Sequence, residues 1–235
     1  MARKLKMRIW RGDADNGGLQ DVTVEANEGE VVLDVIHRVQ ATQMGDLAVR
    51  WNCKAGKCGS CSMEINGKPR LACMTQVASF DENETITVTP LRAFPVIKDL
   101  VVNRSSFDRI IAAGGFISVN TGNAKDANNI PINKDNADEA FAAAACIGCG
   151  ACVAACKNAS AMLFTSAKIS QLALLPQGQI EAATRAQAMV AQMDEEGFGA
   201  CSNTGACEAE CPKGISIENI ARMNREYFSA TFSSK

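Results

Sequence analysis

Cysteine content constrains this chain more than any other feature of its sequence, because 11 cysteines accompany a single histidine. An odd number of cysteines cannot be paired completely in internal disulfides. The single histidine excludes a Cys2His2 zinc site and a histidine-rich catalytic centre. The net charge of -2 and the lack of a long basic tract exclude the electrostatic footprint of a nucleic-acid-binding protein. Function must therefore be sought in the spacing of the cysteines.

The N-terminal residues indicate a cytosolic chain whose cysteines are reduced. Residues 1–8 are basic, but they lack the apolar core, the cleavage site and the twin arginines of secretory signals, and cytosolic thiols are normally reduced. Residues 140–156 carry no charge, yet they consist mainly of Ala, Gly and Cys. A membrane span needs about 20 strongly apolar residues. We therefore expect a helix end and a cofactor loop in this segment.

Hydrophobic periodicity predicts a β-rich N-terminal part. Strands are predicted at residues 5–9, 22–24 and 85–89, with a hairpin turn at 13–18. Residues 62–67 predict a further strand that runs into an Asn-Gly turn. The helical spacing of apolar residues between Val32 and Val39 predicts one amphipathic helix. These elements together predict a small mixed sheet that packs on one helix.

From about residue 105 the β-type alternation gives way to alanine-rich segments. Helices are predicted over residues 108–113, 137–145, 170–175, 180–193 and 217–228. Residues 120–136 are rich in Asn, Asp and Lys and predict a surface loop. The change of pattern divides the chain into a first domain, residues 1–103, and a second domain, residues 104–235.

The first group of cysteines is Cys53, Cys58, Cys61 and Cys73. Their C-x4-C-x2-C spacing, followed at a distance by another Cys, is the plant-type [2Fe-2S] pattern. Gly56 and Gly59 would let the loop curl closely and leave its amides pointing at the sulfurs. The alternative is a zinc loop, but zinc loops prefer paired C-x2-C units, so the x4 spacing favours iron and sulfide.

The second group of cysteines is Cys146, Cys149, Cys152 and Cys156. Its C-x2-C-x2-C-x3-C spacing is the bacterial ferredoxin run. In two-cluster proteins of this type, the fourth cysteine ligates the other cluster. Three thiolates at x2 intervals fit three corners of a cubane, whereas zinc rarely takes three successive ligands in this way. The spacing therefore predicts a [4Fe-4S] cluster.

The third group of cysteines is Cys201, Cys207 and Cys211, and Thr204 stands where the template has another cysteine. By the crossing rule, one cluster receives four ligands and is a [4Fe-4S] centre, with the set Cys146, Cys149, Cys152 and Cys211. The other cluster receives Cys156, Cys201 and Cys207. A cubane corner without a thiolate readily loses its iron, so a [3Fe-4S] centre is predicted there. The alternative is that Thr204 is a neutral change and that water or hydroxide completes a fourth iron.

Three clusters in this order resemble the iron-sulfur subunit of succinate dehydrogenase and fumarate reductase over essentially the whole chain. The resemblance is carried by the cysteine runs of residues 53–61, 71–73 and 146–156, and by residues 211–214, Cys-Pro-Lys-Gly. It implies an α+β protein, with an N-terminal β-grasp domain of the plant-type [2Fe-2S] ferredoxin kind and a C-terminal all-α domain of the bacterial ferredoxin kind. It also implies an FAD-containing flavoprotein partner, and membrane anchor subunits that bind quinone and often haem b. These partners would hold the chain at the cytoplasmic face of the inner membrane.

The chain departs from the family pattern near the predicted third cluster. Lys157 stands where family members commonly have proline after the cysteine. Ubiquinone-using members place a tryptophan a few residues further on and a histidine after the cysteine that matches Cys201; residues 157–161 contain no tryptophan, and Ser202 replaces the histidine. The ubiquinone site of that branch is therefore not carried over. A menaquinone-linked or otherwise different anchor is the hypothesis that these departures raise.

The sequence predicts an electron-transfer chain within a succinate:quinone oxidoreductase, running from FAD through [2Fe-2S], [4Fe-4S] and [3Fe-4S] to quinone. The same task in a fumarate reductase or another flavoprotein-linked reductase is the alternative, and a zinc-stabilised interaction module is the rival from another class. No nucleophile–base pair, phosphate loop or nucleotide fold is apparent, so we expect no catalytic residue and no dicarboxylate site on this chain. His37 is expected to face solvent, and Trp51 to pack near the first cluster.

Overall fold

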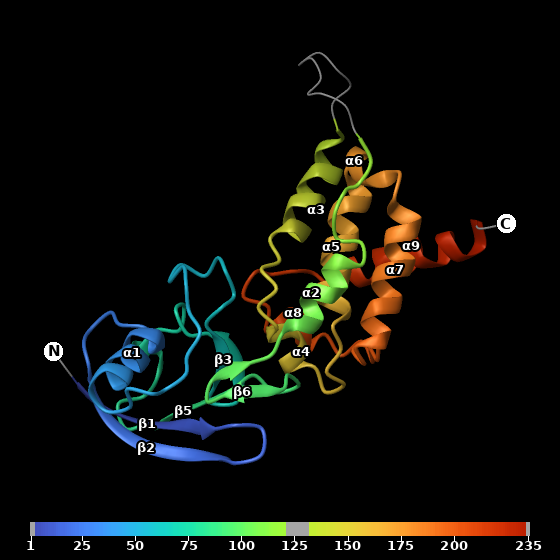
Figure 1. Ribbon diagram of the computed structural model, residues 1–235. Coiled ribbons are helices and arrows are strands. Elements are labelled where there is room, and N and C mark those ends of the chain that lie inside the picture. Colours follow the sequence, from blue (N-terminus) through green and yellow to red (C-terminus); the bar gives the residue numbers. More distant parts are fainter. Residues whose placement is uncertain (1–2, 121–131, 234–235) are drawn as a thin grey trace. The chain divides into compact units, whose positions relative to one another are not determined.

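The computed structural model describes residues 3–120 and 132–233, and the contacts within the chain divide it into two units (Figure 1). The first unit comprises Met1–Arg104 together with Ile147–Ala155, and the second comprises Ser105–Cys146 together with Cys156–Lys235. The boundary between residues 103 and 104 stays a prediction. No sequence pattern indicated that the short segment Ile147–Ala155, which holds two cysteines of the second group, belongs with the first unit.

The first unit is built on a long hairpin of β1 (Arg3–Gly12) and β2 (Gly17–Ala26). The two strands pair antiparallel without a register shift from Arg3↔Ala26 to Gly12↔Gly17. Apolar side chains of β1 alternate with charged ones, and Leu5, Met7 and Ile9 are each at most 1% exposed. One face of the hairpin therefore belongs to the core, as the alternation predicted.

The rest of the sheet is assembled around β5 (Ile86–Thr89), which pairs parallel with β1 and antiparallel with β3 (Ser62–Ile65). The strand order is β2-β1-β5-β3-β4, with β4 (Lys68–Leu71) at the edge. The predicted Asn66-Gly67 turn joins β3 to β4, and both of its residues have positive φ angles, 48° and 74°. Such angles are those of the tight turns that suit a twisted hairpin.

Helix α1 (Val32–Thr42) packs its apolar residues with this sheet, as predicted. Its buried residues are Val32, Leu33, Val35, Ile36 and Val39. A second, two-stranded sheet of β6 (Val96–Lys98) and β7 (Val101–Val102) was not predicted, because strands of two or three residues are too short to show an alternation. A short 3-10 helix, Val77–Ser79, completes the regular elements up to Arg104.

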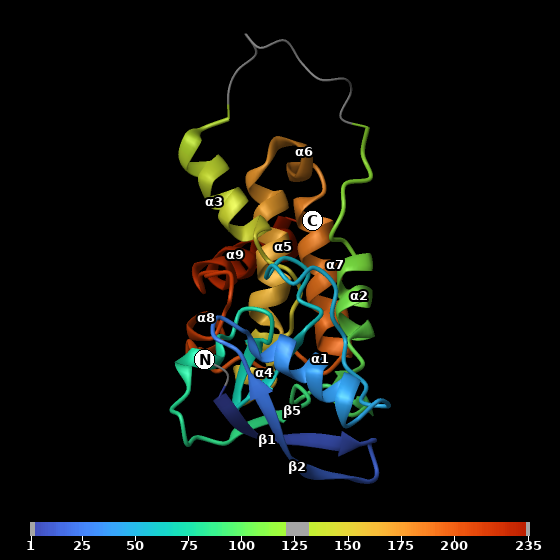
Figure 2. The same cartoon turned by 90° about the vertical axis from the view of Figure 1, so that its left-hand side faces the viewer.

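The second unit is helical. Its longer helices are α2 (Ser105–Ala112), α3 (Lys134–Ala144), α5 (Met162–Leu174), α7 (Ala182–Glu195) and α9 (Glu218–Ser233). Helix α5 lies among α3, α7 and α9 in both views of the chain (Figures 1 and 2). The short helix α6 (Pro176–Gln179) follows α5 and begins with proline, whose fixed φ suits a first helical turn.

Helix α5 is longer than the sequence predicted, because it begins at Met162 rather than Ser170. Nearly all of its turns are buried, including the polar Thr165, Ser166 and Ser170. A helix that is covered on most sides shows no amphipathic stripe, so periodicity could not find its first half. The loop predicted over 120–136 lies mostly outside the described residues, and its last part, from Lys134, already belongs to α3.

Two short helices lie within the cysteine groups: α4 (Ala151–Ala155) in the first unit, and α8 (Ala206–Ala209) in the second. The uncharged stretch 140–156 thus contains the end of α3, an irregular loop and α4, in agreement with the prediction of a helix end and a loop. Within residues 3–120 and 132–233, none of the helices has both the length and the apolar character that a bilayer span requires.

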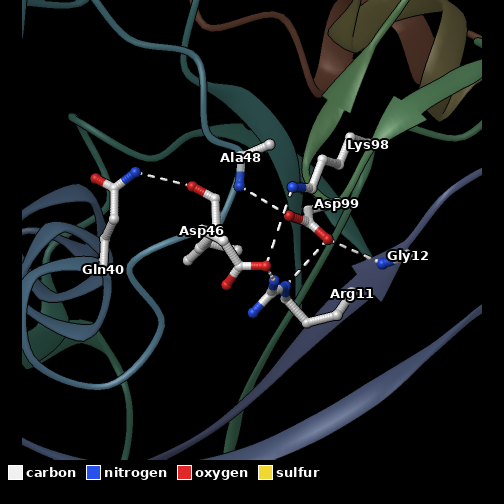
Figure 3. A network of polar contacts seen from close by, with 8 residues as sticks. Arg11, Gly12, Gln40, Asp46, Ala48, Lys98 and Asp99 are labelled. Carbon is white, nitrogen blue, oxygen red and sulfur yellow. Dashed lines mark hydrogen bonds and ion pairs between the residues drawn. The ribbon is translucent and has the colours of Figure 1, made fainter.

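Asp99, in the turn between β6 and β7, connects three segments of the first unit (Figure 3). Its side chain is 1% exposed and accepts hydrogen bonds from Arg11 Nε at 3.0 Å, Gly12 N at 2.9 Å and Ala48 N at 2.8 Å. Arg11 also donates from Nη2 to the exposed Asp46 at 2.6 Å. The buried carboxylate therefore ties the end of β1 to the segment that leads into the first cysteine group.

Replacing Asp99 by Asn is expected to lower the free energy of unfolding by about 3 kcal/mol, because Arg11 would lose its only buried anionic partner among the described residues. Denaturant unfolding followed by circular dichroism measures this loss. Asp46→Asn is the matched control, since Asp46 bonds the same arginine but its side chain is 70% exposed. If both variants lost the same free energy of unfolding, burial of the Asp99 carboxylate would not be the cause of the loss.

Candidate iron-sulfur sites

The β3–β4 hairpin brings together two of the four cysteines of the first group. Cys61 directly precedes β3 and Cys73 lies two residues after β4, so the pairing of Ser62 with Leu71 places both at the same end of the hairpin. The Ala72 amide donates to the Cys61 carbonyl at 3.1 Å. Cys61 is 3% exposed and Cys73 is 5% exposed, so both thiols lie in the core of the first unit.

The other two cysteines of the group, Cys53 and Cys58, lie on a tightly curled loop. Three residues of this loop have positive φ angles: Lys54 at 53°, Gly56 at 62° and Gly59 at 67°. Because Gly56 has no side chain, it adopts this left-handed backbone conformation without steric strain. The curl turns backbone amides toward sulfur, as the sequence predicted for this loop.

Backbone amides contact the sulfurs of this loop directly. Cys53 Sγ accepts from the amides of Ala55 and Lys57, both at 3.3 Å, and Cys58 Sγ accepts from the amide of Ser60 at 3.5 Å. Such a concave set of N–H groups favours an anion. In a cluster loop it stabilises the negative charge of the thiolate ligands and influences their reduction potential.

The thiols differ in how readily they ionise. Burial opposes ionisation of Cys58, but hydrogen bonds from the Ser60 side chain and from the backbone outweigh it and lower the pKa of Cys58 to about 6. Burial raises the pKa of Cys61 to about 12, and the adjacent Cys73 contributes to the rise. Soft sulfur donors on a preformed amide cradle are the ligand set that iron-sulfur clusters use, so these four residues fit a [2Fe-2S] cluster.

Trp51 lies beside this loop and is 48% exposed. Its ring is 4.8 Å from the ring of His37, and Lys54 Nζ lies 5.0 Å from the Trp51 ring centroid. The prediction that His37 faces solvent is wrong, because the indole lies against it. The imidazole is half-buried, and its buried Nε2 has no hydrogen-bond partner within residues 3–120 and 132–233. Burial, followed by the charge of Lys54, lowers the pKa of His37 below its usual value.

The second cysteine group is divided between the two units. Cys149 and Cys152 belong to the first unit, where Cys149 is 8% exposed and forms part of the core. Gly148 and Gly150, on either side of Cys149, have positive φ angles of 60° and 84°. Cys146 and Cys211 belong to the second unit, and Cys211 Sγ accepts from the amide of Ile215 at 3.4 Å. The predicted set of four ligands stays a prediction.

The third site lies entirely within the second unit, as a cavity of about 310 Å³ that includes space open to solvent. Its lining contains the three predicted cysteines together with Thr204, namely Cys156, Cys201, Thr204 and Cys207. The residue without a thiol thus faces the same cavity as the three residues with one. Ser160, Met162 and Leu163 also line it.

The third site has the same kind of loop chemistry as the first. Asn203, with a φ of 52°, donates its amide to Cys201 Sγ at 3.4 Å, and Gly205, with a φ of 75°, precedes α8. Burial raises the pKa of Cys207, and the neighbouring Cys156 and Cys201 add to the rise. The cavity, the adjacent thiols and the amide donor fit a cluster with three cysteine ligands. Over residues 3–120 and 132–233, no cluster of His, Cys, Asp and Glu is arranged to hold a single metal ion.

Comparison with known proteins assigns the family. The family described as "2Fe-2S iron-sulfur cluster binding domain" matches residues 6–109, and the family described as "4Fe-4S dicluster domain" matches residues 142–215. The succinate dehydrogenase iron-sulfur subunit of Bacillus subtilis is 33% identical over 185 residues, which are 76% of this chain and 72% of that protein. The chain belongs to the family of iron-sulfur subunits of succinate dehydrogenases and fumarate reductases.

Other relatives cover more of the chain. The fumarate reductase iron-sulfur subunit of Wolinella succinogenes is 28% identical over 238 residues, covering 97% of this chain and 99% of that protein. A chain of the solved structure "Mycobacterium smegmatis Sdh1 complex in the apo form" is 37% identical, with a TM-score of 0.78 and coverage of 99% of this chain and 98% of that chain. The α+β fold with two ferredoxin-type domains is confirmed.

The family defines this chain as an electron-transfer iron-sulfur subunit of an oxidoreductase complex. It carries a [2Fe-2S] domain and a [4Fe-4S] dicluster domain in the predicted order along the chain. The zinc-stabilised interaction module is therefore wrong. The assignment of each cysteine to a particular cluster stays a prediction.

Replacing Ser60 by Ala is expected to lower the reduction potential of the [2Fe-2S] centre, because the variant removes a side-chain hydrogen bond to the Cys58 sulfur. Hydrogen bonds to cluster sulfurs stabilise the more negative, reduced state. A redox titration followed by electron paramagnetic resonance (EPR) measures the potential. Ser79→Ala is the control, since the exposed Ser79 hydroxyl donates only to the Gln76 carbonyl among the described residues. A potential equal to that of the control would refute the assignment of this bond.

Proposed function

We propose that this chain conducts electrons from the FAD of a flavoprotein subunit to a membrane quinone in a succinate:quinone oxidoreductase. The observation that carries the proposal is the cavity of the third site, which is lined by three cysteines and by Thr204. Thr204 stands where the ferredoxin motif has a fourth cysteine. When bound, the clusters supply one-electron carriers that let a two-electron flavin discharge stepwise. The chain's own residues hold the carriers, exclude water from them and set their electrostatic surroundings.

The proposed ligand sets use every cysteine of the chain once. Cys53, Cys58, Cys61 and Cys73 hold [2Fe-2S]; Cys146, Cys149, Cys152 and Cys211 hold [4Fe-4S]; Cys156, Cys201 and Cys207 hold [3Fe-4S]. Support comes from the hairpin, the amide–sulfur bonds and the shared cavity described above. In this assignment Thr204 leaves one cubane corner without a thiolate.

Exposed residues support two separate partner surfaces. Beside the first cysteine loop, Trp51 is 48% exposed and Met74 is 59% exposed, and we assign this surface to the flavoprotein. On α9, Phe228 and Phe232 are 59% and 78% exposed and lie four residues apart, hence on one helix face. Exposed apolar patches of this kind mark interaction sites, and we assign this one to the membrane anchor subunits. Through that anchor the chain would lie at the cytoplasmic face of the inner membrane.

Succinate oxidation is the proposed direction, with fumarate reduction as the alternative. Succinate dehydrogenase is favoured because the relative from Bacillus subtilis and the solved Sdh1 chain are the more similar in sequence, at 33% and 37% identity. Fumarate reduction is supported by the relative from Wolinella succinogenes, whose alignment covers 97% of this chain. Both directions would use the same ligands on this chain.

EPR of the purified complex tests the assignment of the clusters. We expect a [3Fe-4S] signal in the oxidised complex and a [2Fe-2S] signal after reduction with succinate. Replacing Thr204 by Cys is expected to supply the missing thiolate, to remove the [3Fe-4S] signal and to add about one iron per chain, as full ligation of a cubane requires. Iron analysis of the same samples measures the gain.

Ser202→Cys is the matched control for this substitution, because Ser202 lines the same cavity but lies one position after Cys201, outside the x2 spacing. It should keep the [3Fe-4S] signal. If the Ser202 and Thr204 variants behave alike, the proposed ligand set of the third cluster is incorrect. A wild-type complex without acid-labile sulfide would contradict the proposed function as a whole.

The region that departs from the ubiquinone branch supports a different quinone. Asn158 Nδ2 donates to Ser202 Oγ at 3.0 Å, so one of the residues at the positions expected for tryptophan contacts the residue at the position expected for histidine. Ser202 itself lines the cavity of the third site. A small polar pair thus replaces the aromatic side chains, and we propose a menaquinone-linked anchor.

Quinone specificity of the purified complex tests this proposal. We expect turnover with menaquinone analogues to exceed turnover with ubiquinone analogues by about tenfold or more, a ratio that corresponds to about 1.4 kcal/mol in transition-state stabilisation. Succinate oxidation and quinol-driven fumarate reduction are measured on the same preparation, which also decides the favoured direction. Fast turnover with ubiquinone and none with menaquinone analogues would reject the menaquinone assignment.

A further inference from the structure

Part of the second cysteine motif is built into the core of the first unit. In the segment Ile147–Ala155, Cys149 is 8% exposed and Ala151 is 1% exposed. A Cβ atom added at Gly150 would lie 3.0 Å from the ring of Phe94, so no side chain fits there without displacing that ring. Helix α4 of this segment contacts β4, the strand that leads to Cys73. Sequences from two different cluster motifs therefore share one core.

The two motifs approach each other closely at Gly59, which lies between two cysteines of the first loop. A Cβ atom added at Gly59 would lie 2.9 Å from Cα and Cβ of Cys149 and 2.9 Å from the Ile147 carbonyl oxygen. Real Cβ atoms do not approach backbone this closely. The main chain of the first loop thus lies directly against the main chain of the second loop.

Arg104 joins the same two loops. Its Nη1 donates to the Gly59 carbonyl at 3.1 Å, to the Gly148 carbonyl at 3.0 Å and to the Cys149 carbonyl at 2.8 Å. The Gly59 carbonyl also accepts from Ser62 Oγ at 2.9 Å, and this second bond further restricts its orientation. A charged donor bonded to several carbonyls in a partly buried place is a strong and costly contact to break.

We propose that Arg104 is a positioning residue for electron transfer between the first and second cysteine sites. Its guanidinium holds the two loops in contact and places a positive charge beside both. The inference rests on the proposed function, in which the electron donor is the reduced flavin of the partner and the final acceptor is quinone. Transfer of one electron oxidises one centre, reduces the next and breaks no bond, so the chain contributes through distance and electrostatics.

Two substitutions of Arg104 distinguish a positioning role from a purely structural one. One nitrogen, Nη1, makes the three bonds to the Gly59, Gly148 and Cys149 carbonyls, and a lysine ammonium also offers several donors and a charge on one nitrogen. Methionine preserves an apolar stem of similar length but has neither donor nor charge. Rescue by lysine but not by methionine is therefore expected if the charge and the bonds matter.

The experiment compares Arg104→Met, Arg104→Lys and the wild type in the purified complex. Three quantities are measured: the magnetic interaction between the two reduced centres by EPR, the midpoint potential of the [2Fe-2S] centre, and the rate of electron transfer past it by rapid freeze-quench. For Arg104→Met we expect a weaker interaction, a lower potential and a rate loss of about tenfold, in the range of losses from residues that support metal ligands. Arg104→Lys should restore most of each.

Arg3→Met is the matched control. The Arg3 guanidinium also bonds only backbone carbonyls in the described part of the chain, to Val77 at 3.0 Å and Phe80 at 3.3 Å, within the first unit. It should leave all three quantities unchanged. If Arg104→Met matches Arg3→Met, the proposal is overturned. It is equally overturned if the lysine and methionine variants lose rate to the same extent while the potential stays constant.

Gly59→Ala tests the same contact while the charge of Arg104 is retained. It replaces the Arg104 variants if these do not assemble into the complex. The added Cβ must push the two loops apart, so the magnetic interaction should weaken while iron content is retained. Gly29→Ala is its control, because Gly29 has a similar φ of 79° but nothing within 4 Å of the added atom. Equal spectra for the two glycine variants would refute the inference. A wild-type complex that lacks the two centres would instead refute the proposed function.

Discussion

Compensation of sulfur charge by backbone amides is the interaction on which the cysteine sites depend. At the first and third sites, thiols accept N–H bonds from the residues that follow them, at 3.3–3.5 Å. These bonds require a backbone that curls back on itself, which explains the positive φ angles of Lys54, Gly56 and Asn203. The sulfur ligands and the shape of the loop are therefore one feature, because the bonds exist only in the curled conformation.

The cysteine spacing was highly informative because this chemistry is local. A plant-type loop or a bacterial ferredoxin run needs its thiols within a few residues of each other, so their identity and order could be predicted from the sequence. The strands β1, β2 and β5 and the helix α1 could also be predicted, since one face of each is buried and the other is more exposed. In these elements the alternation of apolar and polar residues directly predicts which side chains are exposed.

The features that were missed depend on long-range packing. The first half of α5 is covered on most sides and has no stripe. His37 is covered by Trp51, which comes from a segment fourteen positions further along the chain. The segment Ile147–Ala155 joins the first unit through contacts at Gly59, Gly150 and Arg104, and nothing in its own composition distinguishes such contacts from ordinary loop packing.

Burial differs between the cysteine sites in a way that suits a conductor with an accessible end. Cys61 and Cys149 are 3% and 8% exposed, and their loops share one core. Cys201 and Thr204, in contrast, are exposed at the rim of the third cavity. Burial raises the energetic cost of a charged, reduced centre, whereas exposure lowers it, so exposure affects potential as well as access. In the proposed assignment, the exposure that gives a partner molecule access to the third cluster thus also favours the reduced state of that cluster.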